Sequence, residues 1–197
     1  IPIGTDLEDW ESGTFTKYEW ETGSIYPWEL TTSNCFEGTY SARSKEISNS
    51  QTSQVSISIN VAHADSISFY YYVSCEAGNG SLYDRLEFYI DNSLQSYWDG
   101  EVSWSSAAFP VTAGNHTFYW KYVKDSYLAE GQDLAMIDYI ILPEKVRETS
   151  LENFEKVSVS VFPNPASDYI NIEINNCDLQ IKQIELCDVY GKLIKKE

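Results

Sequence analysis

The chain has 197 residues, enough for one or two domains, and a formal net charge of −17 at pH 7. Such an acidic surface repels phosphate backbones, so we expect no nucleic-acid partner. No run of about 18 apolar residues occurs, so we expect no membrane-spanning segment. The composition includes 15 Tyr and 6 Trp, and aromatic side chains favour strands and offer surface for stacking on ligands.

Composition changes near residue 143. Residues 1–143 carry 6 Lys+Arg against 20 Asp+Glu, a net charge of −14, whereas residues 144–197 carry 7 against 10, a net charge of −3. The join is polar and charged, as expected of a linker or one short helix. We therefore predict a first domain over residues 1–143, a linker over 144–156 and a small second domain over 157–197.

The first segment contains short runs that are typical of strands. Residues 54–61 alternate polar and apolar side chains with a period of two, as a half-buried strand does. Residues 66–73 are nearly continuous aromatic and β-branched residues, which indicates a central strand. Further strands are expected at 85–90, 95–98, 116–123 and 136–142. Because no long stretch shows a helical period, the pattern favours an all-β fold, a two-sheet jelly-roll β-sandwich.

The second segment opens with another alternating strand at residues 157–162. Pro163 and Pro165 end it, because proline cannot donate to a strand ladder. Two more strands are expected at 169–174 and 181–189, and no closing strand is expected before the sequence stops. Three strands are close to the minimum for an independently stable sheet, so we interpret this segment as a partial β-sandwich that has been truncated.

The chain contains four cysteines, Cys35, Cys75, Cys177 and Cys187. None stands in a CxxC spacing, which disfavours a zinc site. The even number permits disulfides, and buried free thiols are equally compatible with the sequence.

Two stretches of the second segment carry the pattern of a known family. Residues 161–172 read VFPNPASDYINI, and residues 185–194 read ELCDVYGKLI. Over residues 157–197 the segment resembles the type A C-terminal sorting domain of the type IX secretion system. The resemblance implies contact with the type IX secretion machinery and export to the extracellular space or the bacterial cell surface, where disulfides are permitted.

The first segment resembles cleaved-adhesin and MAM-like jelly-roll modules. The matching stretches read DLEDWESG at 6–13, EGTYSARS at 37–44, YDRLEFYID at 83–91 and AGNHTFYWKYVKD at 113–125. The resemblance implies a non-catalytic adhesion or accessory binding module of a larger secreted bacterial protein, with a host or matrix protein or a glycan as its partner. Two alternatives are a carbohydrate-binding module of a secreted hydrolase and a structural spacer domain of a secreted peptidase.

The same resemblance implies a metal. In modules of this kind, a carboxylate on the first strand and one on the last strand often share a calcium ion, and the matching residues here are Glu8 and Asp138. Asp6 and Asn34 would supply further oxygen ligands, which Ca²⁺ prefers. The ion would have a structural role and would offset repulsion among the acids of this segment. The alternative is that these residues are solvated surface acids.

Four aromatic residues are candidates for ligand binding because they lie in or beside expected turns, namely Tyr83, Tyr97, Trp98 and Trp104. Their ring faces could stack on sugar rings, with Asp99 and Glu101 as hydrogen-bond acceptors. The alternative is that these rings fill the core or cover a sheet edge.

No catalytic residue is predicted. His63 and His116 are the only imidazoles, and neither a GxSxG nor an HExxH motif is present. Two acids could meet as in a glycoside hydrolase, but no pattern marks a pair. We therefore expect no enzymatic activity from this chain.

Overall fold

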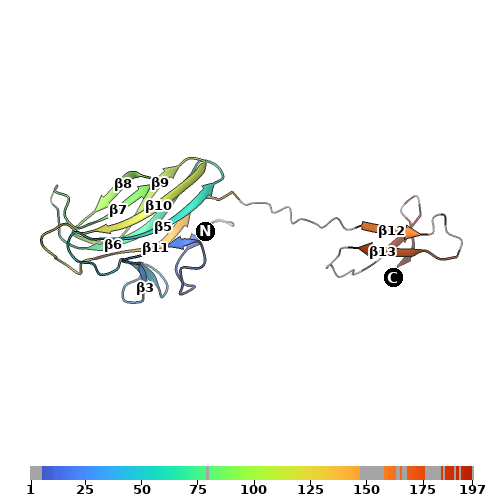
Figure 1. Cartoon of the computed structure of the whole chain (residues 1–197), viewed down its shortest axis with the longest axis horizontal. Helices are drawn as coiled ribbons and strands as arrows, with labels where there is room; N and C mark the ends of the chain where they lie inside the picture. The colour runs from blue at the N-terminus through green and yellow to red at the C-terminus, as the bar shows by residue number, and fades with distance from the viewer. Residues whose placement is uncertain are drawn as a thin grey trace. The chain divides into compact units, whose positions relative to one another are not determined.

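The computed structural model describes residues 6–78, 80–146, 158–162, 165, 168–175, 183, 185–188, 190 and 192–196. Contacts divide the chain into two units, residues 1–147 and 148–197, and strands make up the regular structure in both (Figure 1). Within the described ranges, no helix has the length and hydropathy that crossing a bilayer requires.

The first unit is a sandwich of two sheets, called here sheet A and sheet B. Sheet A has the order β3 (Glu29–Thr31), β4 (Ser41–Arg43), β11 (Leu134–Leu142), β6 (Asp65–Ser74) and β9 (Glu101–Val111), with β1 (Asp6–Glu8) also paired to β11. Sheet B has the order β2 (Trp20–Glu21), β5 (Thr52–Val61), β10 (Gly114–Val123), β7 (Arg85–Ile90) and β8 (Ser93–Trp98). All pairings between these strands are antiparallel, which confirms the predicted two-sheet β-sandwich.

The first strand of the sandwich lies beside the last one. β11 pairs with β4 through Met136 and Ile137, and with β1 farther along, where Asp6 lies opposite Leu142. β1 and β4 therefore share one edge of β11, and the two ends of the sandwich meet at the same place.

The core lies between the two sheets and is rich in aromatic rings. Trp120 of β10 is fully buried, and its ring centroid lies 5.2 Å from that of Phe69 in β6 and 5.0 Å from that of Phe88 in β7. The alternation predicted for residues 54–61 places every second side chain of β5 in this core, namely Val55, Ile57, Ile59 and Val61. Burial of these apolar faces is the main force that holds the sheets together.

One long strand was not expected from the sequence. β9 contains serine, alanine and Pro110, which have a weak preference for strands. It forms nevertheless because it pairs with β6 along most of its length, and because it lies at the edge of sheet A, where proline is tolerated.

The second unit consists of hairpins in its described residues. β12 (Ser158–Phe162) pairs with β13 (Asn171–Asn175), and β14 (Glu185–Cys187) pairs with β15 (Leu193–Lys196). The expectation that no further strand precedes the end of the sequence is therefore wrong. Most of the predicted linker, Pro163 and Cys177 lie outside the described residues, whereas Cys35, Cys75 and Cys187 are free thiols.

Candidate functional site

The face of sheet A that is turned away from the core carries a group of aromatic rings. Phe36 stacks on Tyr70, with ring centroids 3.4 Å apart and an interplanar angle of 14°. The Phe36 ring also meets Trp104 edge-on at 6.2 Å and Tyr139 at 6.0 Å, and Tyr72 lies 5.8 Å from Trp104. We call these five residues the sheet A aromatic cluster.

Strand alternation explains why β6 contributes to both faces of its sheet. Phe69 and Tyr71 point into the core and are buried, so their neighbours Tyr70 and Tyr72 point outward. On the next strand, β11, the register shifts between Asp138 and Ile141. This bulge gives Tyr139 a φ of 48° and places its ring beside Tyr70, at 6.2 Å.

The loop that carries Phe36 is held down by hydrogen bonds. The buried Asp138 carboxylate accepts from the backbone N–H of Phe36 at 3.0 Å and of Glu37 at 3.3 Å. The Trp104 indole N–H donates to Asn34 Oδ1 at 2.9 Å, and the Ser41 hydroxyl donates to the Asn34 carbonyl at 2.7 Å. These contacts fix the Phe36 ring on the sheet.

A groove of about 480 Å³ lies next to the cluster on the same face. Its lining residues are small, aromatic or aliphatic, and none carries a charge: Ser68, Phe69, Tyr70, Ser106, Ala107, Ala108, Tyr139 and Ile141. The groove exists because the short side chains of β6 and β9 stand between larger ones, and Ser68 pairs directly with Ala108. Its volume falls within the range typical of small-molecule pockets.

The structure does not bring together the four aromatic residues predicted from the sequence. Trp104 lies in the sheet A aromatic cluster, whereas Tyr97 is on β8 in sheet B, where it pairs with Glu87. Trp98 faces the interior, because its ring stacks on Tyr71 with centroids 4.1 Å apart. Tyr83 precedes β7 and is 37% exposed.

Sequence reasoning missed four of the five residues of the sheet A aromatic cluster, namely Phe36, Tyr70, Tyr72 and Tyr139. One signal was available for Tyr70, because residues 66–70 alternate serine or tyrosine with apolar residues. That alternation predicts a polar and aromatic outer face, but the run was interpreted only as a central strand. No local pattern marks the bulge that exposes Tyr139, since it depends on pairing with β6.

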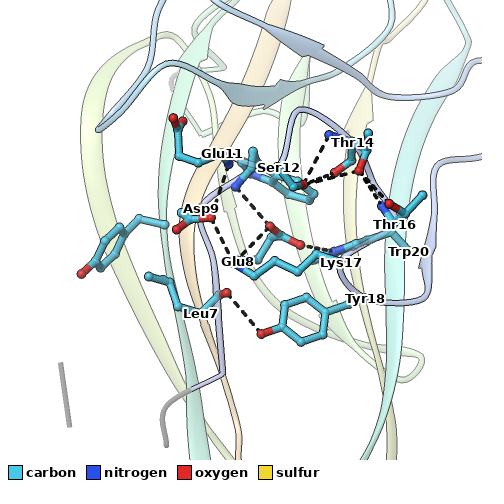
Figure 2. A network of polar contacts seen from close by, with 12 residues as sticks. Leu7, Glu8, Asp9, Glu11, Ser12, Thr14, Thr16, Lys17, Tyr18 and Trp20 are labelled. Carbon is cyan, nitrogen blue, oxygen red and sulfur yellow. Dashed lines mark hydrogen bonds and ion pairs between the residues drawn. The ribbon is translucent and has the colours of Figure 1, made fainter. Parts of the chain in front are cut away.

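Among the predicted calcium ligands, the Glu8 carboxylate already accepts hydrogen bonds from other groups of the protein (Figure 2). Its side chain is fully buried, and its carboxylate accepts from Trp10 N at 3.1 Å and Trp20 Nε1 at 3.0 Å. Lys17 Nζ lies 4.0 Å away. Burial raises the pKa of Glu8, although these hydrogen bonds oppose the rise.

Glu8 and Asp138 point to opposite faces of sheet A. Glu8 pairs with Ile140, a core residue, whereas Asp138 pairs with Tyr70 on the outer face. Both Asp138 oxygens accept backbone hydrogen bonds, and burial raises the pKa of this carboxyl to about 7. Asp6 of β1 pairs with Leu142 of β11, and Asn34 Oδ1 already accepts a hydrogen bond from the Trp104 indole N–H. This arrangement does not fit one ion shared by the four residues, and calcium there stays a prediction.

The two histidines have different partners. His116 Nδ1 lies 3.0 Å from Asp91 Oδ2, and Nε2 lies 3.1 Å from the Thr112 hydroxyl, all at one end of β10. His63 is exposed and lies 3.7 Å from Glu144. These contacts orient His116 at a turn.

The known proteins that resemble the first unit differ from the family that matches the second unit. Residues 160–197 match the family described as the secretion system C-terminal sorting domain. No curated protein matches the chain.

Several solved structures resemble the sandwich. The C-terminal family 22 carbohydrate-binding module of Clostridium thermocellum Xyn10B is 11% identical, with 72% of this chain and 94% of that chain covered and a TM-score of 0.51. A xylan-binding domain from CBM 22 is 11% identical, with 72% and 95% covered and a TM-score of 0.50. The secreted serine protease VesC from Vibrio cholerae is 12% identical, with a TM-score of 0.46, and the match covers 71% of this chain but 28% of that chain.

At these identities the structural likeness supports the fold, a two-sheet β-sandwich. The match over residues 160–197 concerns the second unit, where the FPNP stretch and the DVYGK stretch stand. Residues 160–197 are a type IX secretion C-terminal sorting domain, so the protein is secreted to the cell surface or the extracellular space.

Proposed function

We propose that the sandwich is a non-catalytic carbohydrate-binding module that takes a neutral glycan into the groove on the outer face of sheet A. The observation that carries the proposal is the lining of this groove. Tyr70 and Tyr139 offer ring faces for stacking on sugar rings, and the Ser68 and Ser106 hydroxyls can donate to and accept from sugar hydroxyls.

Charge narrows the class of glycan. No charged side chain lines the groove, and the module as a whole carries a net charge of −14 over residues 1–143, from 6 basic and 20 acidic residues. An anionic polysaccharide would be repelled by this field, so a neutral one is favoured. The fold is shared with two family 22 carbohydrate-binding structures, which supports this function over protein adhesion.

The groove can be blocked at one position without touching the core. Ala108 is an exposed residue on β9, so Ala108→Glu places a longer, charged side chain in the groove. Gln95 is equally exposed on β8, the edge strand of sheet B, and Gln95→Glu adds the same charge elsewhere. The two variants form a matched pair, because both keep the strands and make the net charge more negative by one unit.

The test is affinity gel electrophoresis of the whole chain against a panel of neutral polysaccharides. We expect at least one polysaccharide to slow the migration of the wild type and of Gln95→Glu, and to leave the migration of Ala108→Glu unchanged. Equal retardation of both variants would refute a site in the groove, and a loss confined to Tyr97→Ala would move the site to sheet B. Silence across the panel, together with salt-sensitive binding to a basic protein, would favour the adhesin alternative.

A further inference from the structure

Three carboxylates converge at one end of the sandwich, away from the groove. Glu76 follows β6, Asp84 precedes β7 and Asp125 follows β10. One carboxylate oxygen of each residue lies within 4.8 Å of the others. Glu76 and Asp84 stand near the two ends of the loop between β6 and β7, and Asp125 stands in the loop between β10 and β11, so the fold brings two loops together at this point.

Two oxygens in this group are buried without a hydrogen-bond donor. Asp84 is fully buried, and its Oδ2 has no hydrogen-bond partner, although its Oδ1 accepts from Asp125 N at 2.8 Å. Glu76 Oε2 is also buried and unpartnered. A buried carboxylate oxygen without a hydrogen-bond donor is costly, by about 1–3 kcal/mol or more, so the lack of a donor at both oxygens favours a bound cation.

The protein supplies only part of the positive charge that the group needs. Lys124 Nζ lies 3.5 Å from Asp84 Oδ2, without hydrogen-bond geometry, and it forms an ion pair with Asp133 as well. The Lys124 ammonium is therefore shared between Asp84 and Asp133, and no ion pair of Glu76 or Asp125 occurs among the described residues.

We propose that Glu76, Asp84 and Asp125 bind a calcium ion. The ligands are all hard oxygens, which calcium and magnesium prefer. Three oxygens spread evenly around one ion stand about 4.0–4.5 Å apart when each Ca–O bond is about 2.3–2.6 Å, and about 3.5–3.6 Å apart when each Mg–O bond is about 2.0–2.1 Å. The limit of 4.8 Å on the separations in this group is therefore closer to the spacing that calcium requires.

The site would join the two sheets at their open end. Asp84 and Asp125 flank neighbouring strands of sheet B, and Glu76 extends from sheet A. Because the protein is secreted, it meets calcium at concentrations that suit the dissociation constants of extracellular modules, about 10⁻⁴–10⁻³ M. Calcium binding here would stabilise the folded state by linkage, and it does not depend on the glycan site.

The experiment is a calcium titration of the decalcified whole chain by isothermal calorimetry, paired with thermal melts. We expect one calcium ion to bind, and Glu76→Gln and Asp125→Asn each to weaken binding about tenfold or more, because each removes a charged ligand. Glu130 is exposed farther along the loop that carries Asp125, and the control Glu130→Gln should bind within about twofold of the wild type. Absence of binding, or equal binding by both ligand variants and the control, would overturn the site.

Two further measurements separate a metal site from a merely structural cluster. Without calcium, Glu76→Gln should melt no lower than the wild type, because it removes one of several repelling charges. With about 5 mM calcium the wild type should gain melting temperature and the variant should not. If instead Asp138→Asn abolishes calcium binding and Glu76→Gln does not, calcium binds at the residues predicted from the sequence and the proposal is wrong.

Discussion

Two buried tryptophans should respond differently to the same substitution. Trp10 and Trp120 are both fully buried, but the Trp10 Nε1–H donates to the Ile137 carbonyl at 3.2 Å, whereas Trp120 Nε1 has no partner. Phenylalanine keeps a ring at each position and removes the N–H. The difference in the free energy of unfolding between the two variants therefore combines the contribution of one buried hydrogen bond at Trp10 with the penalty of one unsatisfied donor at Trp120.

The expected magnitudes follow from these contacts. Either substitution loses about 1–2 kcal/mol of apolar burial and packing. At Trp10 the lost hydrogen bond adds about 1 kcal/mol to this loss. At Trp120, removal of an unsatisfied donor returns about 1–3 kcal/mol, so the two terms nearly cancel. We expect Trp10→Phe to be less stable than Trp120→Phe by about 2–4 kcal/mol, or roughly 10 °C in melting temperature.

The assay is urea unfolding followed by far-UV circular dichroism, because tryptophan fluorescence changes with the substitutions themselves. The slope of the transition should be the same in both variants, so the midpoints report stability directly. If Trp120→Phe unfolds as early as Trp10→Phe, the Trp120 indole has a partner in solution, and the reasoning from its unsatisfied N–H fails.

Three further predictions concern other parts of the chain. Gly131 has a φ of +68°, and a Cβ there would meet Glu101 and Ser74, so Gly131→Ala should lower stability by about 1–3 kcal/mol, and an unchanged thermal melt would contradict this. Burial raises the pKa of Cys75 to about 12, so iodoacetamide at pH 8 should label the exposed Cys187 and spare Cys75, as judged by mass spectrometry; labelling of both would be evidence against it. Deletion of residues 160–197 should retain the protein inside the cell envelope, measured by fractionation, and normal release would count against the sorting role.

The sequence predicted best where the pattern is local. The period of two over residues 54–61 became β5, and residues 85–90 became β7, because each strand places alternate side chains in a single core. β9 escaped prediction because its residues prefer other structures, and only pairing with β6 makes it a strand. The pairing partner of β9 is far away in the sequence, so no short stretch of sequence contains the information that makes it a strand.

The candidate site was harder to predict than the fold for a related reason. Tyr97 and Trp98 are adjacent in the sequence, so strand geometry sends them to opposite faces, one to solvent and one to the core. The Phe36 ring reaches Tyr70 only because the Asp138 carboxylate, about a hundred residues later, holds its loop. Such contacts depend on the tertiary fold, and turn position alone does not reveal them.

The meeting of the first and last strands has a mechanical consequence. Asp6 lies opposite Leu142, so tension applied through the chain at these two points would pull an antiparallel pair apart from one end. The hydrogen bonds between β1 and β11 run across the strands, and in this geometry they would break one after another instead of sharing the load. On a cell surface under flow, the seam between these two strands is therefore where we expect the sandwich to yield first.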